Sequence, residues 1–450
     1  MKNTPQFSLH ILVAAVVAMA VFMVWPKAVM AQKGNNAVYP AGGGACCTPS
    51  ASFVDASAFV VPNNGDTICS IIYVILANPV YSAAVIDARS LSTNPNVSMT
   101  CANGTTPWNN GSGLINKPST ILLPSGVIST FVPWVLPNQT HLVGQGDTAT
   151  LTTTSGTVIK AKANFSGAAL IQFGDSTISP CCTEISVEKL SLNGDGETIN
   201  GIINQYSQDF SYVDHVGLYQ ILGVGLMVSG SASESGPYSN INFDTGNSSG
   251  SSSTSCVNIN GVSTRGVRAL SCVSETINSA AAVLLDASNN SLEDVRIMGF
   301  LDGVRVGANA VAKSNVLVNI LGDTHYNGSV PPPIYTVHIE PGTNVRDLTI
   351  VGAGNSAISG TFTIYDELTG IHLQDSTVGM YVLGEAANNG VSFFTTSPHA
   401  PSWATGKTYP GNSIPCAQGS IYSCTGTSSN CNNKALWGCP HPGGNWQGIL

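Results

Sequence analysis

Short strands, rather than helices, account for the hydrophobic pattern from about residue 84 to residue 391. Apolar and β-branched residues occur there in short runs, and Gly, Asn, Asp and Ser separate the runs, which is typical of strands joined by turns. Helical spacing of apolar residues is nearly absent. The best candidate helix is 67–77, which follows the turn-forming residues 62–66. The pattern therefore predicts an all-β chain with one short helix near its start.

The strands recur at similar intervals along the chain. One series of inward apolar residues has steps of 21 to 32 residues, and a second has steps of 20 to 33 residues, with a short step followed by a long one at the same place. The first series is Leu190, Val216, Ile241, Val267, Val295, Val316, Leu348 and the weaker Ser376, and the second is Ile202, Leu226, Val257, Leu284, Val304, Val337 and Ile364. Repeats of this length with two or more strands predict a right-handed parallel β-helix, whose coils complete each other's core by stacking.

The spacing also predicts where the coils carry their longer loops. The gaps from the second series back to the first stay short, whereas the gaps from the first series to the second vary widely. The insertions concentrate in 245–255, 273–280 and 321–334. Insertions on one face of a solenoid often mark its binding face.

The start of the chain has the pattern of an export signal. Lys2 precedes an apolar run at 9–24, and Ala31 provides a small residue for cleavage. All twelve cysteines follow Ala31 and none forms a CxxC pair, which favours disulfides over a metal site. No second apolar stretch is long enough to cross a membrane. We therefore expect a secreted or cell-surface protein.

The chain divides into five expected segments. The segment between Cys69 and Cys101 is expected to cap the first coil, with its helix held by a disulfide. The last segment has four cysteines and two tryptophans, and at its size it needs disulfides to be stable. The segments are a signal peptide at 1–31, an N-terminal region and cap at 32–83, the parallel β-helix at 84–395, a linker at 396–415 and a Cys-rich C-terminal module at 416–450.

Charge excludes one class of partner. The 25 acidic residues outnumber the 16 basic ones, and the net charge is −9, so the chain offers nucleic acid no basic surface. Tryptophan is absent from the coils between 185 and 391, which counts against a deep oligosaccharide cleft.

Three short segments resemble the opening coils of the pectate lyase superfamily. They are 86–89 (Ile-Asp-Ala-Arg), 123–126 (Leu-Pro-Ser-Gly) and 142–146 (Leu-Val-Gly-Gln-Gly), and 303–307 (Gly-Val-Arg-Val-Gly) resembles its recurring rung. The resemblance covers roughly 84 to 391 and implies a pectin lyase-like solenoid that acts on polysaccharide. The motifs of its hydrolase members are absent, which makes a glycoside hydrolase the weaker interpretation. For its lyase members the resemblance implies a Ca²⁺ ion held by carboxylates and a basic residue, usually Arg, that removes a proton beside a uronate carboxyl.

One candidate site has this combination of residues. In the expected register Arg268 and Arg296 follow inward residues of neighbouring coils and point outward about 4.8 Å apart. Asn242 occupies the same column one coil earlier, and Asp244 follows it on the strand. We take Arg268, Arg296 and Asp244 as candidate catalytic residues. The candidate substrate-binding residues are Asn242 and four residues of the long loops, Glu275, Asp323, His325 and Tyr326.

Two interpretations of other features remain open at this stage. The polar column Lys189, His215, Asn240, Gly266, Asp294, Asn315, Asp347 and Asp375 is better explained as a structural ladder of turn residues than as a site. The protein as a whole is either a lyase-like enzyme on acidic polysaccharide or a non-catalytic adhesin or fibre. In both cases the expected partner is a polysaccharide or a cell-envelope glycan, and in the second the C-terminal module serves attachment or oligomer assembly.

Overall fold

The computed structural model describes residues 53–395, apart from short gaps, and four strands beyond them. The gaps lie at 82, 112, 148–155, 178–181, 247–253, 310, 324–330, 342–344, 356–360, 369–370, 375–377 and 384–390. The expected signal peptide therefore lies outside the described residues. Among the described residues no helix is long and apolar enough to cross a membrane.

The helix near the start of the chain forms where the sequence predicts it. It is α2 (Ile68–Ala77), flanked by the short turns η1 (Ala56–Phe59) and η2 (Leu91–Thr93). Thr67 and Ser70 form a reciprocal capping box, in which the Thr67 side chain accepts from the Ser70 N–H at 3.0 Å. The apolar side of α2 is buried. A disulfide holds this helix to the chain before the third strand, as expected, and the structure gives its pairing: Cys69 with Cys101, whose Cα atoms lie 5.3 Å apart.

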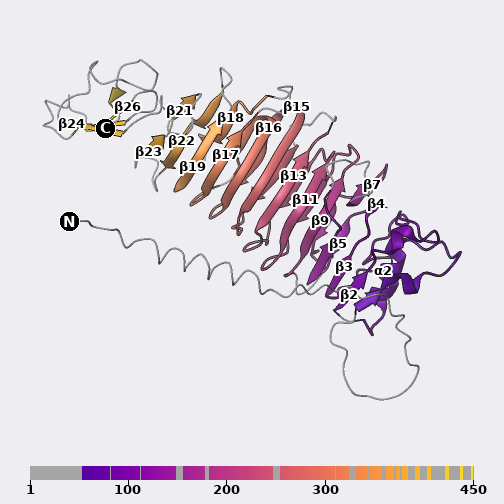
Figure 1. Ribbon diagram of the computed structural model, residues 1–450. Helices are drawn as coiled ribbons and strands as arrows, with labels where there is room; N and C mark the ends of the chain where they lie inside the picture. Colours follow the sequence, from indigo (N-terminus) through magenta and orange to yellow (C-terminus); the bar gives the residue numbers. More distant parts are fainter. Residues whose placement is uncertain are drawn as a thin grey trace, which may run out of the picture. The chain divides into compact units, whose positions relative to one another are not determined.

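The described strands between residues 53 and 366 pair with one another in parallel and form a β-helix, as predicted (Figure 1). Strands of successive coils lie side by side and pair in parallel, and they form three walls that we call A, B and C. The strands before the first long ones are β1 (Phe53–Asp55), β2 (Ala84–Asp87), β3 (Ser119–Leu122), β4 (Gly126–Thr130), β5 (Trp134–Leu136), β6 (Thr140–Val143), β7 (Thr157–Ala161) and β8 (Ala169–Phe173). The middle coils contain β9 (Ser186–Asn193), β10 (Asn200–Asn204), β11 (Tyr212–Tyr219), β12 (Val224–Val228), β13 (Tyr238–Asp244), β14 (Ser255–Asn260), β15 (Val267–Asp286) and β16 (Ser291–Val306). The later strands are β17 (Val316–Gly322), β18 (Tyr335–Ile339), β19 (Leu348–Asn355), β20 (Phe362–Asp366), β21 (Ile371–Gln374), β22 (Val378–Leu383) and β23 (Val391–Thr395).

Wall A consists of β1, β2, β3, β6 and the first parts of the long strands β9, β11, β13, β15, β16, β17 and β19. A bend inside these long strands separates wall A from wall B, which consists of β4, β7 and the parts of the long strands beyond the bend. Wall C consists of β5, β8, β10, β12, β14, the last parts of β15 and β16, β18 and β20. β6 pairs with the first part of β9, and β7 pairs with the part of β9 beyond Lys189. In six successive coils the bend residue has a left-handed φ between 50° and 56°, at Lys189, His215, Asn240, Ala269, Asp294 and Asn319, and in the next coil it is Gly352, with a φ of 70°. His, Asn and Asp adopt this conformation more readily than most residues. The polar column of the sequence is therefore structural at Lys189, His215, Asn240 and Asp294. At Gly266, Asn315 and Asp347 the prediction is wrong, because the bend residues of those coils are Ala269, Asn319 and Gly352, and Asp375 lies outside the described residues.

Wall C carries the second series of inward residues. Ile202, Leu226, Val257, Val304, Val337 and Ile364 are all fully buried and lie in one column, with Val283 where the sequence predicts Leu284. This column is a continuous part of the core, because each residue is covered by its equivalents in the coils before and after it.

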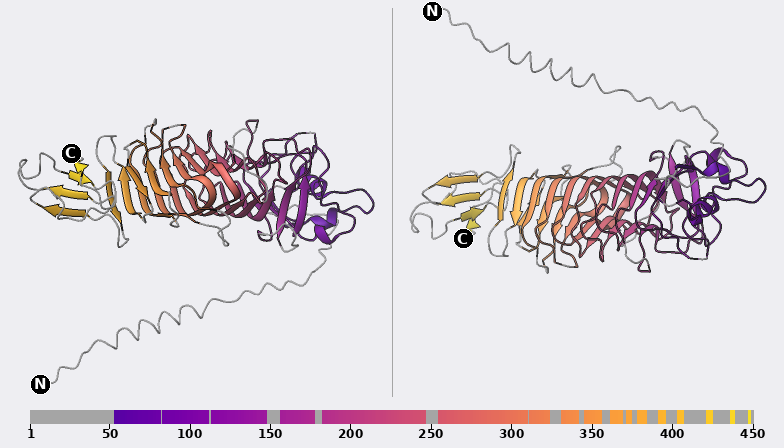
Figure 2. Two further views of the ribbon diagram at one scale, coloured as in Figure 1. Left: turned by 90° about the horizontal axis from the view of Figure 1, so that it is seen from above. Right: turned by 90° about the horizontal axis from the view of Figure 1, so that it is seen from below.

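The described strands beyond wall C change direction. β20 pairs with β21, β19 with β22 and β22 with β23, all antiparallel (Figure 2). A separate four-stranded sheet follows, made of β24 (Trp403–Gly406), β25 (Ile421–Cys424), β26 (Leu436–Gly438) and β27 (Gln447–Gly448). β24 pairs with β25, so this sheet begins inside the segment expected to be a linker.

Candidate functional site

The two arginines of the sequence-derived site do not share a column. Arg268 lies opposite Ser239 in the preceding coil and Glu293 in the next one, whereas Arg296 lies opposite Ser271, which lies opposite Asn242. The expected register is wrong here because Val267 and Leu270 both face the core, one on each side of the bend at Ala269. An apolar residue on either side of the bend allows two registers that the sequence cannot distinguish. Arg268 therefore belongs to wall A and Arg296 to wall B.

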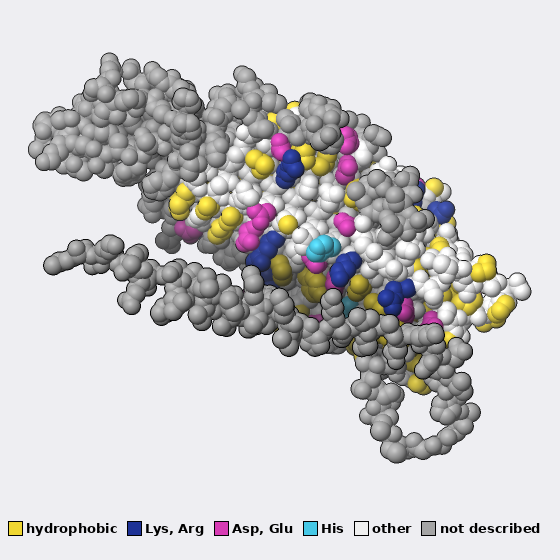
Figure 3. Space-filling view, in the orientation of Figure 1, with side chains coloured by type: hydrophobic (Ala, Val, Ile, Leu, Met, Phe, Trp, Pro, Cys, Tyr) yellow, Lys and Arg dark blue, Asp and Glu magenta, His cyan; other side chains and the backbone are white. Residues whose placement is uncertain are grey.

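Both arginines are also paired with carboxylates. Nε of Arg268 lies 3.2 Å from Oε2 of Glu293, and Nε of Arg296 donates to Oδ2 of Asp323 at 2.8 Å. The arginine side chains are 52% and 57% exposed. Exposed pairs of this kind contribute little to stability, but they leave no net positive charge to attract a uronate. On the face drawn in Figure 3, basic side chains likewise lie beside acidic ones.

The remaining residues of that prediction are scattered. Asp244 caps a turn, since its Oδ1 accepts from the Gly246 N–H at 2.7 Å, and Asn242 donates to the Tyr219 hydroxyl at 3.2 Å. Glu275 is half-buried in β15, a continuous strand that includes the segment 273–280 predicted as a loop. His325 and Tyr326 lie outside the described residues. Asp244 and Asp323 thus interact with nearby residues of the chain. The catalytic role of Arg268, Arg296 and Asp244 stays a prediction, as does the substrate-binding role of the other residues.

A polar groove opens on wall B, several coils earlier. It is a cavity of about 340 Å³ lined by Val127, Ser129, Val158, Lys160, Lys162, Asn193 and Asp195. Nζ of Lys160 lies 2.7 Å from Oδ1 of Asp195. The outward row through Lys160 and Asn193 continues to Tyr219 and Asp244. The groove is polar, but it holds few groups that could take part in acid–base chemistry.

A denser cluster of reactive side chains lies on wall C. Arg305, His338, Tyr365 and His372 occupy one outward column on β16, β18, β20 and β21. Asp302 lies beside this column, on β16. Glu340 and Glu367 follow the last residues of β18 and β20.

Asp302 organises the polar half of the cluster. Its side chain is fully buried, and its Oδ1 lies 3.3 Å from Nδ1 of His338. Arg305 forms an ion pair with Asp302 and lies 3.4 Å from Oε1 of Glu340. Burial alone would lower the pKa of His338, but the hydrogen bond and the charge of Asp302, together with the charge of Glu340, outweigh it and raise this pKa. The imidazole is thus held in one orientation by a buried carboxylate.

Aromatic rings form the other half of the cluster. The ring centroids of Tyr335 and Tyr365 lie 4.5 Å apart, those of Tyr365 and His372 lie 4.0 Å apart, and Phe362 packs against both tyrosines. The ring of Tyr335 also approaches His338, at 5.2 Å. All four rings are partly exposed. Burial, followed by the charges of Tyr365, Asp302 and Glu367, raises the pKa of Tyr335, so its hydroxyl stays protonated and can donate a hydrogen bond.

The sequence contained a signal for this column. Arg305, His338 and Tyr365 each follow a member of the second inward series, at Val304, Val337 and Ile364. Alternation along a strand turns the residue after an inward one to the outside, and the register of these three coils was predicted correctly. The partners Asp302, Glu340 and Glu367 had no such signal.

The cluster combines charged groups and an aromatic surface, both of which are common in binding and catalytic sites. Three carboxylates face one guanidinium and one imidazole, so the group attracts cations and can accept hydrogen bonds from hydroxyls. The rings add a flat apolar surface next to these polar groups.

Comparisons with known proteins yield distant structural similarities. No family model matches the chain, and no curated protein matches it. The mannuronan C-5 epimerase AlgE4 A-module from Azotobacter vinelandii is 13% identical, with 70% of this chain and 91% of that chain covered and a TM-score of 0.31. The AlgE6 A-module of the same organism is 13% identical, with 70% and 96% covered and a TM-score of 0.26. ORF18 of Geobacillus virus E2 is 10% identical, with 88% and 86% covered and a TM-score of 0.28. At these TM-scores, the assignment of the fold rests on the strand pairing of this chain.

Proposed function

We propose that this chain is an exported polysaccharide-binding protein and that wall C, at β16, β18, β20 and β21, is its glycan-binding face. The observation that carries the proposal is the group of partly exposed rings of Tyr335, Phe362, Tyr365 and His372 beside the charged cluster around His338.

The chemistry of sugars matches this surface. A pyranose ring presents C–H groups on its faces, which pack on aromatic rings, and hydroxyls at its edges, which pair with carboxylates and guanidinium groups. Ligand sites generally combine an apolar surface with a few polar groups that determine orientation. Equivalent residues of neighbouring coils repeat at about 4.8 Å, so an extended chain can lie across several of them.

Export is supported by the cysteines. Disulfides of the described chain join Cys69 to Cys101 and Cys256 to Cys272, and disulfides persist mainly in oxidising compartments. The predicted signal peptide at 1–31 agrees with this location.

A binding assay with matched variants tests the proposal. Neutral and uronate-rich polysaccharides are titrated against the wild-type chain and against Tyr365→Ala, Tyr335→Ala and the control Phe210→Ala. Phe210 is 60% exposed and lies between β10 and β11, several coils before the proposed glycan-binding face. We expect at least one polymer to bind the wild-type chain. Each tyrosine variant should lose roughly fivefold or more in affinity, because stacking of a ring contributes about 1 kcal/mol, and the control should bind like the wild type.

Two outcomes would contradict the proposal. One is that no polysaccharide in the panel binds the folded wild-type chain, and the other is that the tyrosine variants bind as tightly as the control. Circular dichroism of each variant separates loss of contact from loss of folding.

The same polymers test the lyase hypothesis through the absorbance of an unsaturated uronate product, with and without Ca²⁺. A lyase that uses Arg268 and Arg296 forms this product and loses it in Arg268→Ala and in Arg296→Ala. Absence of product from every polymer that binds favours the adhesin or fibre hypothesis.

A further inference from the structure

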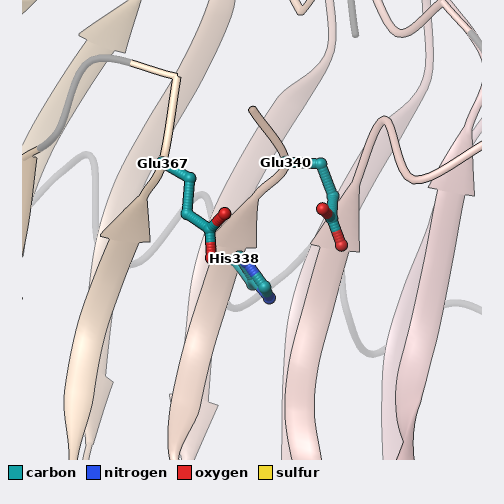
Figure 4. Close-up of side chains that lie close together, drawn as sticks. All are labelled: His338, Glu340 and Glu367. Atoms are coloured by element: carbon teal, nitrogen blue, oxygen red, sulfur yellow. Dashed lines mark ion pairs between the residues drawn. The ribbon is translucent and has the colours of Figure 1, made fainter. Parts of the chain in front are cut away.

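Three side chains of the wall C cluster converge on one point. The nitrogen or oxygen atoms that His338, Glu340 and Glu367 can offer a metal ion all lie within 4.8 Å of one another. Figure 4 shows the carboxylates of Glu340 and Glu367 on the two sides of the His338 ring. This spacing is set by the register of β18 and β20, which places Ile339 opposite Asp366 and thus Glu340 beside Glu367.

The His338 ring is arranged as a metal ligand. Its side chain is 9% exposed, and within the described part of the chain its buried Nε2 makes no hydrogen bond, although Oε1 of Glu367 lies only 3.3 Å away. Nδ1 faces Asp302, which is the usual outer partner of a ligating histidine. A proton on Nδ1, shared with Asp302, leaves the lone pair of Nε2 directed at the point where the two glutamates meet.

The charge of the cluster leaves room for a cation. Asp302, Glu340 and Glu367 are three carboxylates, and Arg305 is their only permanently charged basic neighbour among the described ion pairs. A divalent ion would neutralise the excess. The alternative is a protonated His338 paired with Glu367, which would occupy the same space without a metal.

We propose that His338, Glu340 and Glu367 form a binding site for a divalent transition-metal ion, with Zn²⁺ or Mn²⁺ as the expected class, and that Asp302 is its positioning residue. One imidazole nitrogen with two carboxylates suits these ions better than Ca²⁺, which takes oxygen ligands. Three protein ligands leave a coordination position open. That open position would take a carboxylate oxygen of an acidic glycan, a step that rests on the proposed function.

The metal alone is the first probe. The full-length mature chain, treated with chelator and with its disulfides intact, is titrated by calorimetry with Zn²⁺, Mn²⁺ and Ca²⁺, and Co²⁺ is added to record its visible absorption. We expect a Zn²⁺ site that is lost in His338→Gln and in Glu367→Gln, and Zn²⁺ affinity lowered roughly ten- to hundredfold in Asp302→Asn. The matched control is Glu293→Gln, which removes a carboxylate that pairs with Arg268 on wall A.

The outcomes separate this inference from the proposed function. Zn²⁺ or Co²⁺ binding that disappears in His338→Gln but not in Glu293→Gln supports the site, even when no glycan binds. Equal metal binding by the His338→Gln and wild-type chains overturns it, as does the absence of Zn²⁺ and Mn²⁺ binding by a folded wild-type chain, whether or not that chain binds glycan. Thermal unfolding of each metal-free variant shows whether it has folded.

Discussion

Asn290 links neighbouring coils from inside the β-helix, and its replacement by Ala tests how such buried amides stabilise the stack. Its side chain is 2% exposed. Oδ1 accepts from the backbone N–H and the hydroxyl of Thr264 at 2.8 and 2.7 Å. Nδ2 donates to the carbonyls of Val262 and Ser288 at 3.1 and 2.9 Å. The side chain therefore satisfies backbone groups of the preceding coil that water does not reach.

The magnitude follows from the groups that Asn290→Ala leaves without this partner. The Thr264 hydroxyl can rotate, and the Ser288 carbonyl still accepts from the Ser263 hydroxyl at 3.0 Å. The Thr264 N–H and the Val262 carbonyl lose the amide. At about 1–3 kcal/mol for each of these two buried groups, we expect Asn290→Ala to lower the free energy of unfolding by about 2–6 kcal/mol. Asn258→Ala is the matched control, because the Oδ1 of Asn258 is buried without a hydrogen bond among the described residues, and its removal should cost less than about 1 kcal/mol.

Hydrogen exchange read by mass spectrometry is the assay suited to a stack of coils, since each coil depends mainly on its neighbours. Peptides that cover 262–290 should exchange faster in Asn290→Ala, whereas peptides from 84–143 should not change. Urea unfolding gives the free energy of unfolding for the same variants. The reasoning is refuted if Asn290→Ala exchanges and unfolds like Asn258→Ala.

Three further predictions concern the cap, a charged turn and a close contact between coils. Thr67→Ala removes the N-cap of α2 and should lower the free energy of unfolding by about 1 kcal/mol in urea titrations, and an unchanged midpoint would contradict the cap. The hydrogen bond from Arg89 lowers the pKa of Asp87 below its usual 3.8. The ionised Asp87 therefore stabilises the fold at neutral pH, and this contribution is lost as the pH falls through the folded-state pKa. The difference in melting temperature between the wild type and Asp87→Asn should be larger at pH 7 than at pH 3, and a larger difference at pH 3 would contradict the prediction. Gly225→Ala would place a Cβ 2.6 Å from the carbonyl oxygen of Cys256. Because backbone atoms cannot move aside as a flexible side chain can, calorimetry should show a clearly lower melting temperature. An unchanged melting temperature would contradict the close contact.

The repeat was the most informative feature of the sequence. Six of the seven residues in the second inward series lie in one buried column, and the short helix, Ile68–Ala77, lies within its predicted range of 67–77. Both depend on interactions between residues close in sequence or on a spacing that recurs in every coil. The hydrophobic pattern records such features directly.

The candidate site was harder to predict because it depends on register. The sequence paired Arg268 with Arg296, but the bend at Ala269 lies between two inward residues, so Arg268 faces Glu293 instead. Because Arg268 on wall A and Arg296 on wall B are already paired with carboxylates, the better candidate site is the cluster on wall C. There, Asp302 and His338 are separated by 36 residues and meet only because their coils stack.

The sequence by itself determined that the chain forms a β-helix, where its core column lies and which residues follow that column to the outside. Those properties repeat with the coil, and each coil contributes apolar residues at the same spacing. The tertiary structure alone decided which charged side chains become neighbours, and it placed Glu340 and Glu367 around His338. Contacts between coils depend on left-handed bends and on loop lengths that shift the register by a few residues, and such a shift changes the partner of every outward side chain while the core remains apolar.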